Sequence, residues 1–153
     1  TSSMSRLEKV DEMIKKCANA AAMALDCTVT LTFGLSDFAD MVRNYPLENK
    51  ITELMAGYGL KVGDVPPASG SSDVGNISYR CPAMQSMLSI TDENFALHTR
   101  DFRDATLKPQ AHDAMAKGAC CLADLSLKIF NDDSFRSTVY EAWQKELKNK
   151  QSD

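Results

Sequence analysis

The sequence predicts a mixed α/β protein, because helical and strand patterns both occur within its 153 residues. Apolar residues recur at helical spacing over residues 4–25, which predicts a long amphipathic helix. Residues 27–33 (Cys-Thr-Val-Thr-Leu-Thr-Phe) then alternate apolar and polar side chains, a pattern typical of a half-buried β-strand. Two further strand candidates and three further helices follow.

One helix and one strand cannot bury both their faces alone, so the opening unit indicates the end of a domain whose other strands are absent. The composition changes after residue 34, where the chain is expected to cross to another body. We therefore predict that the residues up to about Gly34 end one domain and that the following chain belongs to a second. The second begins with a helix at Pro46, because proline suits the first helical turn, and the apolar stripe of that helix runs to Tyr58.

The middle of the chain predicts loops and strands. Residues 63–75 are rich in glycine, proline and serine, which indicates a loop. Residues 77–81 and 84–90 are the two short strand candidates, and the polar residues 91–106 are typical of a second loop.

The rest of the chain predicts two helices. Pro109 lies in the first turn of a helix that should reach about Phe130. The run Asn131-Asp132-Asp133 then supplies an N-cap for the last helix.

Composition excludes several classes of function. With 17 Lys and Arg against 21 Asp and Glu, the formal net charge is −4, and no basic cluster outside the last turn indicates nucleic-acid binding. No apolar run reaches the roughly 18 residues that a membrane span needs. The five cysteines form no Cys-x-x-Cys pair, which favours reduced and mostly buried thiols. We expect a soluble, cytoplasmic protein that binds neither nucleic acid nor membrane.

The most informative motif is Gly-Ser-Ser-Asp-Val-Gly-Asn-Ile-Ser at residues 70–78. Its small residues would let the backbone approach a ligand, and successive N–H groups can bind an anion. Asp73 and Asn76 add polar groups just before a predicted strand. The alternative is an ordinary glycine and serine turn with an Asx cap.

The chain has two histidines, His98 and His112. His98 could be a metal ligand, a general base or a surface residue. His112 lies early in a predicted helix beside Asp113, where a histidine most often forms a hydrogen bond or faces solvent. There is no His-Glu-x-x-His motif, no Gly-x-Ser-x-Gly motif and no phosphate-binding loop.

The order of these elements resembles the C-terminal portion of a family of metal-dependent amidohydrolases, which includes aminoacylases, carboxypeptidases and aminobenzoyl-glutamate hydrolases. In the most similar subgroup a Gly-Ser-Thr-Asp-x-Gly-Asn-Val-Ser stretch matches residues 70–78. The subgroup's later His-Thr-x-x-Phe is matched by His98-Thr-Arg-Asp-Phe102. The resemblance covers nearly the whole chain.

The resemblance implies a two-domain enzyme of which this chain is a fragment. Residues 1–35 would end a ferredoxin-like lid or dimerisation domain, and residues 36–153 would form the C-terminal part of an α/β catalytic domain. His98 would be the family's last metal-ligating histidine, with zinc, or else manganese or cobalt, as the metal, and a metal pair in the intact enzyme. The residues lining the substrate side of the metal would be Gly70, Ser71, Ser72 and Asp73.

The implied reaction is cleavage of an amide bond in an N-acyl or aminobenzoyl amino acid or a small peptide. The family's other metal ligands and its general base belong to an N-terminal segment that this sequence lacks, so we expect no catalytic residue here and no activity from the chain alone. Its partners would be a small amide substrate, the missing segment and a second copy. Gln85 departs from an Ile-His-Pro run common in relatives. The alternative is a non-catalytic α/β protein-interaction module.

Overall fold

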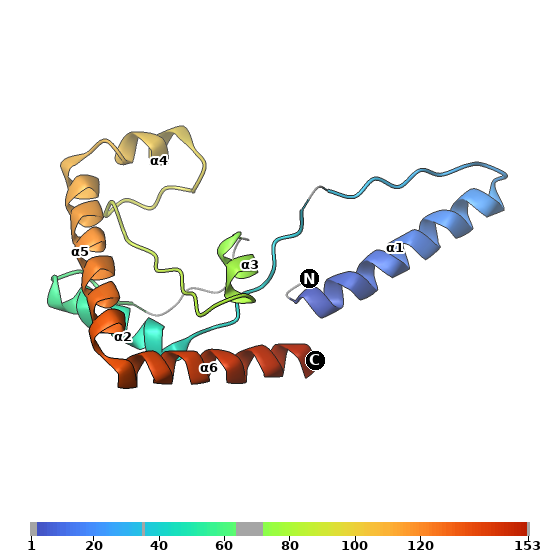
Figure 1. Ribbon diagram of the computed structural model, residues 1–153. Helices are drawn as coiled ribbons and strands as arrows, with labels where there is room; N and C mark the ends of the chain where they lie inside the picture. Colours follow the sequence, from blue (N-terminus) through green and yellow to red (C-terminus); the bar gives the residue numbers. More distant parts are fainter. Residues whose placement is uncertain (1–2, 35, 64–71, 153) are drawn as a thin grey trace.

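A computed structural model describes residues 3–34, 36–63 and 72–152, and the regular structure in these ranges is helical. Its elements, shown in Figure 1, are α1 (Met4–Ala24), α2 (Tyr45–Gly57), α3 (Val74–Ser78), α4 (Arg100–Ala105), α5 (Pro109–Asn131) and α6 (Asp133–Ser152). The four long helices predicted from the sequence are thus confirmed. The short helices α3 and α4 lie where a strand or a loop was expected.

The predicted α/β class is wrong, because the described ranges contain no β-strand. Residues 27–33 run as extended chain, yet no second strand pairs with them in the described structure, and a ladder needs a partner. Their apolar side chains therefore stay exposed, at 41% for Val29, 37% for Leu31 and 45% for Phe33. The structure provides no ferredoxin-like sheet over the described part of residues 1–35.

The other two predicted strands are also wrong. In the first, residues 77 and 78 belong to α3, where the Ser78 hydroxyl donates to the Gly75 carbonyl oxygen at 2.6 Å. Such local side-chain bonds offer the backbone an alternative to a sheet ladder. In the second, residues 84–90 have no regular structure, and Leu88 packs closely against Gly118 of α5. At residues 84–90 the chain therefore packs against helix α5 through Leu88 instead of pairing with a strand.

The hydrophobic core lies where α2, α5 and α6 meet. Figure 1 shows α5 upright, with α6 leaving its lower end and α2 beside both. The buried residues of this core are Leu47, Ile51, Cys121, Leu125 and Val139. Burying apolar side chains of this size contributes roughly 1.5–3 kcal/mol each before entropy is subtracted. The part of the chain that packs around this core is here called the body, and it includes the residues of the candidate site.

Two side-chain caps determine where the core helices begin. Asn44 is fully buried, accepts a hydrogen bond from the Leu47 amide at 3.2 Å and donates to the Val139 carbonyl oxygen at 2.9 Å. It therefore starts α2 and joins it to α6. Asp132 accepts from the Phe135 amide at 2.9 Å, which confirms the cap predicted for the last helix.

Residues 4–34, here called the arm, extend away from the body. Figure 1 shows α1 and the extended chain after it running back alongside each other. The Lys15 ammonium lies 5.3 Å from the centre of the Phe33 ring, which bridges the two segments. Ser3 caps α1 by accepting from the Arg6 amide. The arm contributes no buried residue to the core.

Asp40 joins the arm to the body. Its Oδ1 accepts from the Met4 amide at 3.1 Å and from the Tyr79 hydroxyl at 3.0 Å, and its Oδ2 pairs with Lys150 of α6. Partial burial alone would raise the pKa of Asp40, but these hydrogen bonds and the Lys150 charge hold that pKa below its ordinary value of 3.8. The ionised carboxylate therefore stabilises the folded state.

Replacing Asp40 with alanine should lower the free energy of unfolding at pH 7 by about 2 kcal/mol, because it removes hydrogen bonds to a charged group. Since the folded pKa is depressed, the stability difference from wild type should persist above about pH 4 and vanish as the pH falls through the folded pKa. Urea unfolding measured from pH 3 to pH 7 checks this. The control Asp92→Ala, which removes an exposed carboxylate, should leave the free energy of unfolding at pH 7 nearly unchanged.

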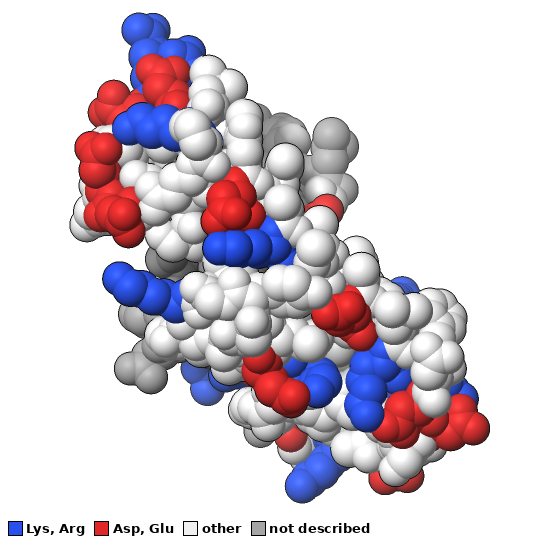
Figure 2. All heavy atoms as spheres, turned by 90° about the vertical axis from the view of Figure 1, so that its left-hand side faces the viewer, with Lys and Arg blue, Asp and Glu red and all other residues white. Residues whose placement is uncertain are grey.

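The surface of the described residues is charged without a broad patch of one sign on the face in view. Figure 2 shows Lys and Arg intermixed with Asp and Glu there. None of the described helices is both long enough and apolar enough to cross a membrane. The prediction of mostly buried cysteines is wrong, because Cys121 is buried and the other four are exposed.

Candidate functional site

The predicted substrate loop leads directly into α3. Gly70 and Ser71 lie outside the described residues, whereas Ser72 and Asp73 are described. Ser72 is half-buried; its carbonyl oxygen accepts from the Gly75 amide at 3.1 Å and its hydroxyl accepts from the Val74 amide at 3.3 Å. The side chain of Asp73 is exposed and makes no capping hydrogen bond to α3. That carboxylate is available to an incoming polar or cationic group.

The second half of the motif contacts the protein itself. A Cβ atom on Gly75 would lie 1.8 Å from the Ala39 carbonyl oxygen, so only glycine fits there. Asn76 bonds to the backbone of residues 37 and 39, and Ser78 bonds to the Val42 amide. The close backbone approach expected at this motif therefore occurs, but to the chain rather than to a ligand. The sequence signal for it was the Gly-Asn-x-Ser run.

His98 lies on the turn that precedes α4. The Thr99 hydroxyl donates to the Ala96 carbonyl oxygen at 2.7 Å and accepts from the Phe102 amide at 3.3 Å, so it caps α4 and closes the turn. His98 adopts a φ of 63°, in the left-handed region, and its side chain is exposed. A non-glycine residue held in this conformation marks a constrained position. The turn thus presents the imidazole to the outside of the body.

The structure does not bring His98 to the substrate loop. In Figure 1, α4 lies near the upper end of α5, whereas α3 lies in the middle of the molecule, above α6. No group of three or more His, Cys, Asp or Glu side chains in the described ranges could hold a metal ion. A catalytic zinc usually takes three protein ligands and a water. The described residues therefore do not fit a metal centre by themselves.

The two remaining positions noted from the sequence are exposed. His112 lies in the first turn of α5, and no contact in the described structure joins it to Ser72 or His98. Gln85 lies in the irregular segment after α3. Neither adds a ligand to a common site in the described residues.

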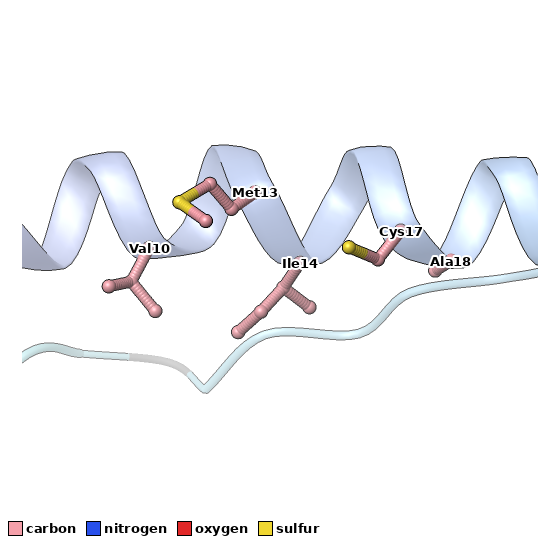
Figure 3. A pocket seen from close by; sticks show the side chains of 5 residues that line it. All are labelled: Val10, Met13, Ile14, Cys17 and Ala18. Atoms are coloured by element: carbon pink, nitrogen blue, oxygen red, sulfur yellow. The ribbon is translucent and has the colours of Figure 1, made fainter.

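An apolar hollow lies on the arm, along α1. The hollow has a volume of about 570 Å³ and opens on one face of α1. Figure 3 shows the side chains that line it. Its lining residues are Val10, Met13, Ile14, Cys17 and Ala18. With an almost wholly apolar lining and no titratable group except the Cys17 thiol, this hollow suits packing against another surface rather than chemistry.

Comparison with known proteins gives a distant but extended similarity. The chain is 26% identical over 152 residues to the mouse Xaa-Arg dipeptidase and 25% identical over 153 residues to the human one. Each alignment covers 97% of this chain but only 34% or 35% of the relative. The chain thus spans about a third of the length of the curated relatives it matches. No protein-family model matches the sequence. The similarity supports a coarse relationship to peptidases.

Proposed function

We propose that this chain is the C-terminal part of a metal-dependent amidohydrolase. The observation that carries the proposal is the similarity to Xaa-Arg dipeptidases along 97% of the chain. It agrees with the resemblance of residues 70–78 and of His98 to a family of amide-cleaving metalloenzymes. The reaction is hydrolysis of an amide bond in an N-acyl or aminobenzoyl amino acid or a small peptide, including a dipeptide that ends in arginine.

In this proposal His98 is one ligand of a metal site that residues outside the described ranges complete. Two features support it: the imidazole is exposed, and the capped turn before α4 holds it in place. Zinc suits an imidazole ligand best, with manganese or cobalt as alternatives, and a metal pair would serve the intact enzyme. The metal would supply an activated water; His98 itself would only bind and orient the ion.

The substrate would lie against the loop before α3. Ser72 and Asp73, together with Gly70 and Ser71, are proposed to line it. The exposed, uncapped carboxylate of Asp73 supports this role, because it can accept hydrogen bonds from an amide or a guanidinium group. A cytoplasmic location belongs to the same proposal.

The test is to assay the chain alone and within the longest natural reading frame that contains it. Each form is incubated with zinc, manganese or cobalt and supplied with N-acyl amino acids, aminobenzoyl-glutamate and Xaa-Arg dipeptides. We expect metal-dependent hydrolysis from the longer form and none from the chain alone, since the chain provides one ligand. Absence of hydrolysis by both forms with every metal and substrate would overturn the proposal.

A non-catalytic interaction module is the second candidate, and the exposed arm favours it. The arm exposes apolar side chains in the hollow on α1 and at residues 29, 31 and 33. Extended chain with unpaired N–H and C=O groups also tends to recruit another chain. Both candidates therefore predict self-association through the arm, and only the first predicts hydrolysis.

Self-association should be measurable directly. We expect the chain to sediment as a dimer or larger species at micromolar concentration. The double variant Leu31→Ser and Phe33→Ser should shift it toward monomer, because it removes two exposed apolar side chains from the extended segment. The matched variant Leu107→Ser, exposed on the body, should leave the distribution unchanged. A monomeric wild-type chain would contradict the prediction.

A further inference from the structure

Segment 37–42, which connects the arm to α2, lies against α3 and is held through its backbone. Asn76 carries two of the contacts: its Oδ1 accepts from the Ala39 amide at 3.0 Å, and its Nδ2 donates to the Asp37 carbonyl oxygen at 2.9 Å. One side-chain amide thus satisfies a donor and an acceptor of the same extended segment, as a neighbouring strand would. This paired contact is here called the Asn76 clamp.

A buried serine fixes the same segment farther along. Ser78 is fully buried, and its hydroxyl accepts from the Val42 amide at 2.9 Å while donating to the Gly75 carbonyl oxygen. The Ser78 carbonyl oxygen accepts from Nε1 of Trp143 at 2.7 Å, which ties α3 to α6. The end of α3 is therefore anchored to the core independently of Asn76.

The beginning of α3 holds the proposed substrate residues. The carbonyl oxygens of Ser72 and Asp73 accept from the amides of Gly75 and Ile77, at 3.1 and 3.3 Å. Both residues therefore move with the first turn of α3. Because the helix has only five residues, a displacement of Asn76 would displace its whole first turn.

We propose that Asn76 is a positioning residue, which orients Ser72 and Asp73 toward the substrate by clamping α3 to segment 37–42. This inference rests on the proposed function, since it assigns a role within the same substrate site. The clamp also connects that site to the arm, because segment 37–42 contains Asp40, which holds the first residue of α1.

Because the two hydrogen bonds of Asn76 are exposed, a positioning role of this residue can be distinguished from a contribution to the stability of the fold. Both hydrogen bonds of Asn76 are exposed, whereas those of Ser78 are buried. Exposed neutral hydrogen bonds contribute little net free energy to folding, so a variant of Asn76 should still fold. We expect such a variant to lose the fixed orientation of Ser72 and Asp73.

The first experiment measures amide hydrogen exchange in the chain by NMR. Asn76→Ala should speed exchange at Ala39 and at Gly75, whose amide bonds to the Ser72 carbonyl oxygen, by about tenfold each. Asn76→Asp keeps the acceptor for the Ala39 amide and should speed Gly75 less. The matched control is Asn131→Ala, which removes an exposed side-chain bond within α5. Faster exchange at Ala39 with no change at Gly75 would overturn the coupling.

The second experiment uses kinetics of the longer form that hydrolyses amides. Asn76→Ala should raise KM about fivefold to tenfold while kcat and bound metal stay within twofold, because substrate is held less well and the metal ligands are untouched. Equal losses in kcat and metal content would overturn the positioning role. If no form hydrolyses any amide, the proposed function fails and the substrate role with it, while hydrogen exchange still decides whether Asn76 clamps α3.

Discussion

Replacing His98 should abolish most of the amide hydrolysis by the longer form that contains this chain. Loss of a side chain that only orients a metal ligand typically costs 10- to 100-fold, so loss of the ligand itself should cost at least about 100-fold in kcat/KM. Bound metal should fall in parallel. Changes at Ser72 or Asp73 should act mainly on KM, since those residues would hold the substrate. Steady-state kinetics with metal analysis of each variant measures the contrast.

The choice of replacement matters because His98 has a φ of 63°. Alanine is disfavoured in the left-handed region, whereas asparagine tolerates it. His98→Asn should therefore keep the turn before α4 while removing the imidazole, and its unfolding midpoint should match that of wild type. His112→Asn is the matched control, because that exposed histidine lies in the first turn of α5. A His98→Asn enzyme that kept its metal and its rate would exclude the ligand role.

The four long helices could be predicted because their signals are local. Apolar residues at helical spacing, Pro46 and Pro109 in first turns and the cap at Asp132 are readable within a few residues. The resulting core of α2, α5 and α6 follows from the apolar faces of those helices.

The strands could not be decided locally. Alternation at residues 27–33 indicates which side chains share a face, but whether a strand forms depends on a partner strand that the described chain does not provide. At α3 the side chains of Asn76 and Ser78 bond to a segment more than 30 residues away, which no local pattern reveals. The small residues of this motif predicted a close approach of the backbone to a ligand, whereas Gly75 lies against the backbone at Ala39.

The candidate site is predictable only as separate residues. His98 and Asp73 stand out by residue type and by their likeness to a family motif, and both prove to be exposed. Their relative position depends on long-range packing of α4 and α3 on the core, and the structure leaves them apart. The described residues therefore do not complete a metal site. This is why we propose that the chain works as part of a larger enzyme, which would supply the other ligands.

Among the glycines that the structure describes, Gly75 should be the position where replacement by alanine is most destabilising. The new Cβ atom would lie 1.8 Å from the Ala39 carbonyl oxygen and 2.8 Å from its carbonyl carbon. Both are backbone atoms, so no flexible side chain can move aside, and α3 must separate from segment 37–42. Since overpacking in a close-packed region costs 1–3 kcal/mol and this contact also breaks the bonds of Asn76 and Ser78, we expect a loss of about 3 kcal/mol. Urea unfolding measures it.

The matched control is Gly57→Ala, because Gly57 is also helical and has no atom within 4 Å of its added Cβ. There alanine should raise stability by up to about 1 kcal/mol, since glycine is the poorer helix former. Opposite signs at two helical glycines would show that the close approach at Ala39, rather than helix propensity, decides the outcome. If Gly75→Ala were as stable as wild type, α3 could not lie against segment 37–42 as described. The Asn76 clamp would then be excluded as well.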